Sequence, residues 1–208
     1  MRPEYVVPVK DGPSFGNVPK AVIGCYKWET GYEPFAYAQL IRLRGTGFLL
    51  RMEAEETDPK ADYSLYNQPV YKDSCLEFFV NFNPDQPKYM NFEMNSNGAF
   101  LAALRTGRKD KTPIHELTKD LPAVSAKKDP DRWSVRVFFP DAFIAQLFGK
   151  DVFRAGDRFL GNFYKCGDET PHPHYGMWSP IDADHPDFHQ SSFFGSFVIE
   201  DEGGSDAV

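Results

Sequence analysis

Hydrophobic and polar residues alternate most clearly near the middle of the chain, in two runs that flank a turn with two prolines. The pattern predicts a β-hairpin formed by residues 76–82 and 89–95. Because successive side chains of a strand point to opposite faces, Glu77, Phe79 and Asn81 share one face, and the apolar residues between them share the other. We expect the apolar face to pack in the core and the other face to form a polar surface.

Similar apolar runs recur along the chain and are separated by turns rich in glycine and proline. The predicted strands are residues 21–28, 35–44, 48–56, 76–82, 89–95, 99–105, 133–139, 157–167 and 192–200. One helix is predicted over residues 141–148, with Asp141 as its cap or in its first turn and Gly149 after its end. These elements predict an all-β fold, a two-sheet antiparallel β-sandwich of the immunoglobulin-like kind with one short helix.

A chain of 208 residues, 41% of them hydrophobic, can bury one sizeable core, and no segment resembles a linker between domains. We expect one β-sandwich domain over residues 21–201. Residues 1–20, which contain several prolines, are predicted to form an extended N-terminal arm, and residues 202–208 a flexible C-terminal tail. The polar residues 57–70 and 106–120 show no sustained period and are predicted to be loops.

Charge and hydropathy limit the partners and the compartment. The formal net charge of −7 gives no support for binding a phosphate backbone, so we expect no nucleic-acid partner. No stretch approaches the roughly 20 apolar residues of a membrane span, so we expect no membrane partner. Cys25, Cys75 and Cys166 are an odd number at distant positions, which favours free core thiols. The N-terminus lacks the apolar run of a signal peptide, which predicts a cytoplasmic protein, or an extracellular one if a leader or a fused enzyme is missing.

Two groups of residues could carry chemistry. Residues 168–190 contain four of the five histidines together with several aspartates, which are the ligands that a zinc or iron centre needs. Their spacing matches no metal motif, so hydrogen bonding is the preferred interpretation. Glu77 and Glu93 could form the carboxylate pair of a glycoside hydrolase, or they could be binding groups. A hydrolase or metal-dependent enzyme that uses residues 172–189 or the Glu77/Glu93 pair is therefore an alternative function.

Several short motifs occur in an order that resembles one known family. They are the sequence DSCLEFF at 73–79, the runs 89–95 and 133–140, the tripeptide Trp178-Ser179-Pro180, the sequence HPDFH at 185–189, and Phe194-Gly195. Together they resemble carbohydrate-binding module family 9 and its DOMON-like relatives, which are β-sandwiches that stand alone or are attached to xylanases and related enzymes. The resemblance implies a DOMON-like β-sandwich that binds a saccharide between two aromatic side chains, without catalysis.

The resemblance also implies site residues. Tyr71 and Phe188 occupy the two positions of the aromatic clamp, where the family has tryptophan. Glu77 and Asn95 match the acidic and amide positions that hydrogen-bond sugar hydroxyl groups, and Glu93 stands where better-known members have arginine. The implied ligand is an oligosaccharide or polysaccharide derived from xylan or cellulose, or the end of such a chain. Flat aromatic surfaces beside planar polar groups suit the apolar face and hydroxyl rim of a pyranose ring.

No cofactor is required for such binding, but the resemblance implies structural calcium. Carboxylates are the hard oxygen ligands that calcium prefers. The candidate donors in the loops are Asp58, Asp62, Asp182, Asp184 and Asp187. No EF-hand spacing is present, so the sequence does not assign individual ligands.

Overall fold

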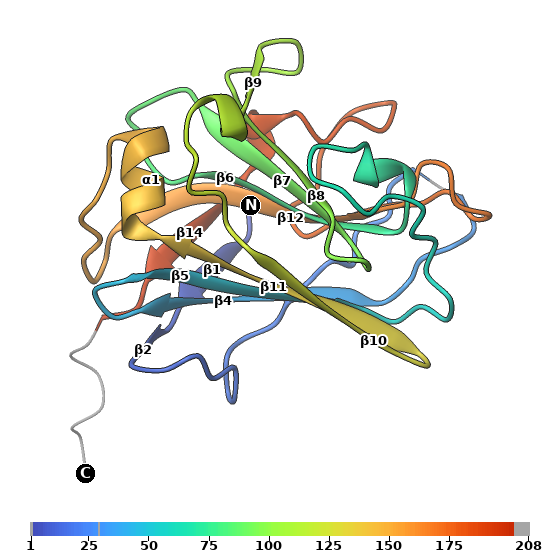
Figure 1. Ribbon diagram of the computed structural model, residues 1–208, viewed down its shortest axis with the longest axis horizontal. Helices are drawn as coiled ribbons and strands as arrows, with labels where there is room; N and C mark the ends of the chain where they lie inside the picture. The colour runs from blue at the N-terminus through green and yellow to red at the C-terminus, as the bar shows by residue number, and fades with distance from the viewer. Residues whose placement is uncertain (1, 29, 202–208) are drawn as a thin grey trace.

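The computed structural model describes residues 2–28 and 30–201, which form two β-sheets packed face to face (Figure 1). The predicted tail, residues 202–208, lies outside the described residues. Within the described chain, one sheet has eight strands in the order β1-β14-β12-β6-β7-β8-β9, with β13 paired to β12. The other has six strands in the order β10-β11-β5-β4-β2, with β3 paired to β4.

The bounds of these elements are as follows. The eight-stranded sheet contains β1 (Glu4–Val7), β6 (Cys75–Asn81), β7 (Tyr89–Asn95), β8 (Phe100–Arg105), β9 (Lys111–Pro113), β12 (Arg158–Cys166), β13 (Tyr175–Met177) and β14 (Gly195–Ile199). The six-stranded sheet contains β2 (Val9–Lys10), β3 (Ala21–Val22), β4 (Ala36–Leu43), β5 (Gly47–Ala54), β10 (Val124–Asp129) and β11 (Arg132–Pro140). The helical elements are η1 (Val70–Lys72), η2 (Ile114–Glu116), α1 (Asp141–Phe148) and η3 (Ser191–Phe193).

The predicted two-sheet β-sandwich with one short helix is confirmed, but both sheets are mixed. Strand β1 pairs with β14 in parallel, and β2 pairs with β4 in parallel. These two strands come from the segment that the sequence predicts to be a separate arm. Tyr5 and Val7 of β1 are buried in the core between the sheets. Residues 4–10 therefore belong to the sandwich, as an edge strand of each sheet in turn.

Helix α1 lies where the sequence predicts it, at one end of the sandwich (Figure 1). It begins directly after Pro140, and Gly149 ends it with a φ of 66°, a left-handed conformation that glycine adopts without strain. Asp141 in its first turn accepts two hydrogen bonds of 2.7 Å each from the guanidinium group of Arg42. No helix formed by the described residues is long and apolar enough to cross a membrane.

Some strands differ from the prediction. The run predicted at 21–28 forms only β3, followed by an isolated bridge between Cys25 and Met177. Strands β9, β10 and β13 form in segments without apolar alternation, because each completes the hydrogen-bond ladder of a neighbouring strand. In β10, for example, all six residues pair with β11 while most side chains remain exposed.

The two faces of β6 are both buried, which corrects one expectation. The apolar face, which includes Phe78, packs between the sheets as predicted. The opposite face is not a polar surface, because Glu77 is only 3% exposed and Phe79 only 1%. The chain that follows β12 folds back over this outer face, and Phe79 packs there against side chains that include Met177 and Ile181.

A buried ionic network joins the two sheets at one end of the sandwich. Lys165 on β12 is fully buried, and its ammonium group lies 3.2 Å from Glu56 Oε2, just after β5. The Glu56 carboxylate also accepts hydrogen bonds from Ser74 Oγ and, at 2.7 Å, from the indole N–H of Trp133 on β11. The ammonium group of Lys165 also donates to Ser74 Oγ at 3.0 Å and to His174 Nε2 at 2.5 Å. Residues from both sheets and from the loop after β12 therefore share one buried charge pair.

Removing one member of this pair should be far more costly than removing a surface charge. We expect Glu56→Gln to lower the free energy of unfolding by about 3–5 kcal/mol, because it leaves the Lys165 ammonium group buried without a counter-charge. Glu4→Gln, which breaks an exposed ion pair with Arg158, should cost less than about 1 kcal/mol. Urea denaturation of both variants measures the difference, and the double variant Glu56→Gln/Lys165→Met should recover part of the loss. If Glu56→Gln and Glu4→Gln lower the free energy of unfolding by equally small amounts, the buried pair does not have this stabilising role.

The same network predicts how stability depends on pH. Burial, together with the nearby Lys165 ammonium group, lowers the pKa of His174 to about 4. Because this folded-state pKa lies below the unfolded value of about 6.5, the stability contribution is complete above pH 6.5 and is lost as the pH falls toward 4. We expect His174 to account for a loss of about 2 kcal/mol between pH 7 and pH 5. Urea denaturation at several pH values gives the free energy of unfolding as a function of pH. This free energy should depend less steeply on pH in His174→Gln than in the wild type, and an equal dependence in both would refute the role of His174.

Candidate functional site

A pocket of about 500 Å³ opens on the outer face of the eight-stranded sheet. Four of the five site residues that the sequence predicts line it: Tyr71, Glu77, Glu93 and Phe188. They come from η1, β6, β7 and the long loop after β13, so segments far apart in the sequence meet here. The remaining lining residues are Asn67, Pro69, Phe79, Leu101, Arg105, Arg108, Lys109, Lys111, Cys166, Asp168, Tyr175, Pro186, Asp187 and His189.

The floor of the pocket carries two carboxyl groups. Glu77 and Glu93 are direct cross-strand partners on β6 and β7, and both are at least 96% buried. Glu77 Oε1 accepts a hydrogen bond from the Cys166 thiol at 2.9 Å, and Glu93 Oε1 accepts one from Asn91 Nδ2 at 2.7 Å. Glu93 Oε2 is buried without a hydrogen-bond partner. An unpaired buried oxygen of this kind costs about 1–3 kcal/mol, which a ligand hydroxyl group could offset.

Both floor carboxyl groups are harder to ionise than usual. Burial, followed by the neighbouring Glu93 carboxyl group, raises the pKa of Glu77 well above its usual value. Burial also raises the pKa of Glu93, to about 7. A protonated carboxyl group can donate one hydrogen bond and accept others. The floor therefore offers both donors and acceptors near neutral pH, which suits hydroxyl groups.

Aromatic rings form the walls. The ring of Phe188 stacks on the buried ring of Tyr164, with centroids 4.1 Å apart and an interplanar angle of 8°. One face of Phe188 is thus fixed against the protein. Tyr175 on β13 meets Phe188 edge-on at 6.3 Å, and Tyr71 belongs to the same apolar cluster. The sequence analysis missed Tyr175, because β13 is too short to show a period.

Basic side chains form another part of the lining. Arg105 on β8 is 8% exposed, and its guanidinium group donates to Asn91 Oδ1 at 2.7 Å and to the Arg108 carbonyl oxygen at 2.8 Å. Arg108 pairs with Asp187 at 3.1 Å. The segment predicted as a solvated loop therefore supplies part of the site. The guanidinium groups that line this pocket come from Arg105 and Arg108.

Asn95 does not line the pocket, which corrects the fifth predicted site residue. Its side chain is fully buried, and its amide nitrogen donates to the Tyr63 carbonyl oxygen and to Asp73 Oδ2, each at 2.8 Å. Its amide oxygen accepts from the backbone N–H groups of Asn97 and Ala99, each at 3.1 Å. All its hydrogen-bonding capacity is used within the protein, so Asn95 holds the turn after β7 and the loop that leads to Tyr71.

The histidine-rich segment does not assemble the predicted alternative metal centre. His174 belongs to the buried network between the sheets, whereas His189 lines the pocket with Nδ1 3.0 Å from the Tyr89 hydroxyl group. Burial, followed by the charge of Arg105, lowers the pKa of His189 to about 4, so the ring is neutral near pH 7. Among the described residues, the histidines of this segment take part in no cluster of three or more possible metal ligands.

The predicted calcium donors do not share a site either. Asp58 and Asp62 line a separate groove beside Lys60. Asp182 pairs with Lys27 at 2.6 Å, and Asp187 pairs with Arg108 beside the pocket. In the part of the chain that the structure describes, the five predicted aspartates form no cluster of three or more. Structural calcium at any of these aspartates stays a prediction.

The chain matches the model of one protein family and superposes on several solved structures. The model of the family described as "Carbohydrate-binding family 9" matches residues 13–199. A proposed carbohydrate-binding protein from Bacteroides uniformis superposes with a TM-score of 0.81 and 23% identity, over 96% of this chain and 100% of the other. No curated protein matches the chain.

Two structures of a family 9 carbohydrate-binding module from Caldicellulosiruptor kristjanssonii share the fold. The complex with cellotriose superposes with a TM-score of 0.70 and 14% identity, over 99% of this chain and 98% of the other. The complex with glucose gives a TM-score of 0.65 and 15% identity, over 99% of each chain. At these identities the structures show a common fold, and the family match over residues 13–199 decides the assignment. The chain belongs to carbohydrate-binding family 9, as the order of its motifs predicts.

Proposed function

We propose that the pocket on the eight-stranded sheet binds a saccharide non-covalently. Tyr71 and Phe188 supply the aromatic walls, and Glu77 and Glu93 hydrogen-bond hydroxyl groups at the floor. The observation that carries this proposal is the convergence of these four side chains on one cavity of about 500 Å³, within the size range of small-molecule sites. The unpaired Glu93 Oε2 at the floor supports it, because a hydroxyl group would satisfy that oxygen.

The proposed ligand is a glucose- or xylose-based oligosaccharide, or the end of such a chain. Two structures of the same fold contain cellotriose and glucose, so gluco-configured sugars are the first class to test. A pyranose with equatorial hydroxyl groups presents flat C–H faces to aromatic rings and a polar rim to carboxyl groups. Tyr175 would extend the aromatic wall beside Phe188.

The family match favours binding over glycoside hydrolysis. Hydrolysis needs two carboxyl groups with different roles, and enzymes set those roles by pushing the two pKa values apart. Here burial raises the pKa of Glu77 and of Glu93 in the same direction. With a pKa of about 7, Glu93 is still partly ionised near neutral pH, so these shifts do not separate the two functions. The match to a family of carbohydrate-binding modules favours binding.

Removing either aromatic wall should weaken sugar binding. We expect Tyr71→Ala and Phe188→Ala each to raise the Kd for cellotriose at least about tenfold, because each removes a ring that covers a sugar face. Phe35→Ala, which removes an exposed aromatic ring outside the pocket, is the matched control and should leave the Kd unchanged. Isothermal titration calorimetry with cello- and xylo-oligosaccharides measures the effect, after thermal unfolding shows that each variant is folded. An unchanged Kd in both Tyr71→Ala and Phe188→Ala would rule out sugar binding in this pocket.

Glu93 and Asn95 lie two residues apart on β7 and should respond in opposite ways. Glu93→Ala removes a floor group, so we expect the Kd for the same sugar to rise at least about tenfold with a stability loss below about 1.5 kcal/mol. Asn95→Ala removes a fully bonded buried amide, so we expect a stability loss of about 2–4 kcal/mol and little change in the Kd. Calorimetry and urea denaturation of both variants test this, and a weakened Kd in folded Asn95→Ala would return Asn95 to the site.

A further inference from the structure

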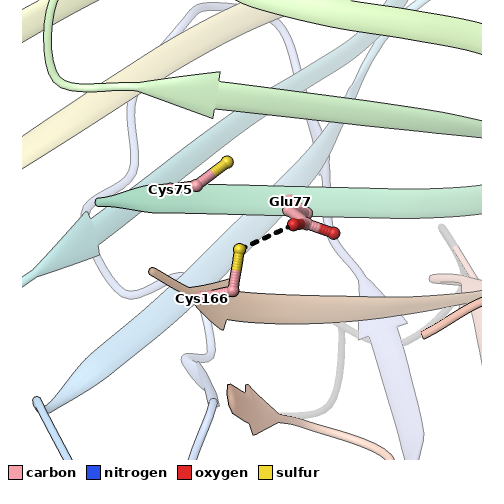
Figure 2. Close-up of side chains that lie close together, drawn as sticks. All are labelled: Cys75, Glu77 and Cys166. Atoms are coloured by element: carbon pink, nitrogen blue, oxygen red, sulfur yellow. Dashed lines mark hydrogen bonds between the residues drawn. The ribbon is translucent and has the colours of Figure 1, made fainter. Parts of the chain in front are cut away.

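Two buried thiols and a buried carboxyl group converge beside the pocket. Cys75 on β6 and Cys166 on β12 are direct partners on antiparallel strands. Glu77 follows Cys75 by two residues, so the period of the strand puts both side chains on the same face. The two sulfur atoms and a Glu77 oxygen all lie within 4.8 Å of one another (Figure 2). Among the described residues, this is the one cluster of three or more histidine, cysteine or acidic side chains close enough to share a metal ion.

An ionised Glu77 would be poorly compensated where it lies. The side chain is 3% exposed and forms no ion pair within the described chain, and it accepts a hydrogen bond of 2.9 Å from the thiol of Cys166, which is a weak donor (Figure 2). The residue paired with it across the sheet is another carboxyl group, Glu93. A buried carboxylate needs a cation or a strong donor beside it. A cation between Glu77 and the two sulfur atoms would supply that charge.

We propose that Cys75, Cys166 and Glu77 bind a thiophilic divalent cation of the zinc class. Two sulfur ligands select a soft or borderline metal over calcium or magnesium, which prefer oxygen. Glu77 and Cys166 also line the pocket, whereas Cys75 is fully buried and does not. With three protein ligands, a tetrahedral ion has its fourth position free for water or a ligand oxygen, and two of those three ligands line the pocket.

Metal binding at this site exchanges protons for the ion and needs no oxidant or reductant. Each sulfur–metal bond replaces one S–H bond, so two protons leave the thiols for solvent, and Glu77 releases a third where it is protonated. The ion remains divalent, and two thiolates with one carboxylate leave the site with one net negative charge. The ligands stand on central strands of the sheet, which hold them in place before the ion arrives.

Cadmium reports such a site directly, because cadmium thiolates absorb in the ultraviolet. The full chain, reduced with a phosphine and kept free of oxygen, is titrated with Cd²⁺. We expect one ion per chain, a charge-transfer band that saturates, and loss of that band when Zn²⁺ displaces the cadmium. X-ray absorption of the wild-type zinc complex should show two sulfur neighbours together with oxygen, which tests the ligand set without any substitution.

The third cysteine provides the matched control. Cys25→Ser should bind Cd²⁺ as the wild type does, because Cys25 lies outside the cluster. Cys75→Ser and Cys166→Ser should each bind at least about tenfold more weakly and lose about half of the band, and Glu77→Gln should bind more weakly with the band kept.

The absence of a saturating band in the reduced wild type would overturn the site, and so would a band that both cysteine variants retain. A stable Cys75–Cys166 disulfide that resists the phosphine and leaves no band would also overturn it. The titration contains no saccharide, so its outcome is separate from that of the proposed sugar binding.

Discussion

The buried contact between Lys165 and Glu56 is the constraint on which the rest of the molecule depends. It links the eight-stranded sheet to the six-stranded sheet, and through His174 it also holds the loop that leaves β12. A charge taken out of water is tolerated only when every partner is in place, so the network specifies one arrangement of these segments. The chain beyond that loop packs on the outer face of the sheet, and its residues Phe188 and His189 line the pocket.

Covering the outer face changes the chemistry of the groups on it. On an open sheet, Glu77 and Glu93 would be hydrated carboxylates. Beneath the loop, burial raises the pKa of both, and one oxygen of Glu93 is left without a partner. A bound ligand, an ion or an ordered water can satisfy such a buried group. The same burial places Glu77 beside two thiols, so one strand position serves both the proposed sugar floor and the proposed metal site.

Sequence reasoning located strands well where side chains alternate and poorly where they do not. Helix α1 follows from local signals, a proline before it and a glycine after it. Strand β10 carries no alternation, because its side chains stay in water and only its backbone pairs with β11. The first residues read as an arm because their prolines interrupt any period, yet Tyr5 and Val7 enter the core when the edges of the sheets accept them.

The sequence by itself determined which side chains are available, and through its order of motifs it indicated the family and four residues that line the pocket. Only the tertiary structure decided how each is used, because packing between distant segments sets burial and hydrogen bonding. Asn95 shares a strand face with Glu93, but backbone groups and the Asp73 carboxylate take up all of its hydrogen bonds. Cys75 and Cys166 are far apart in the chain and meet only because β6 pairs with β12. Local pattern fixes the face on which a side chain lies, and long-range pairing fixes what it meets there.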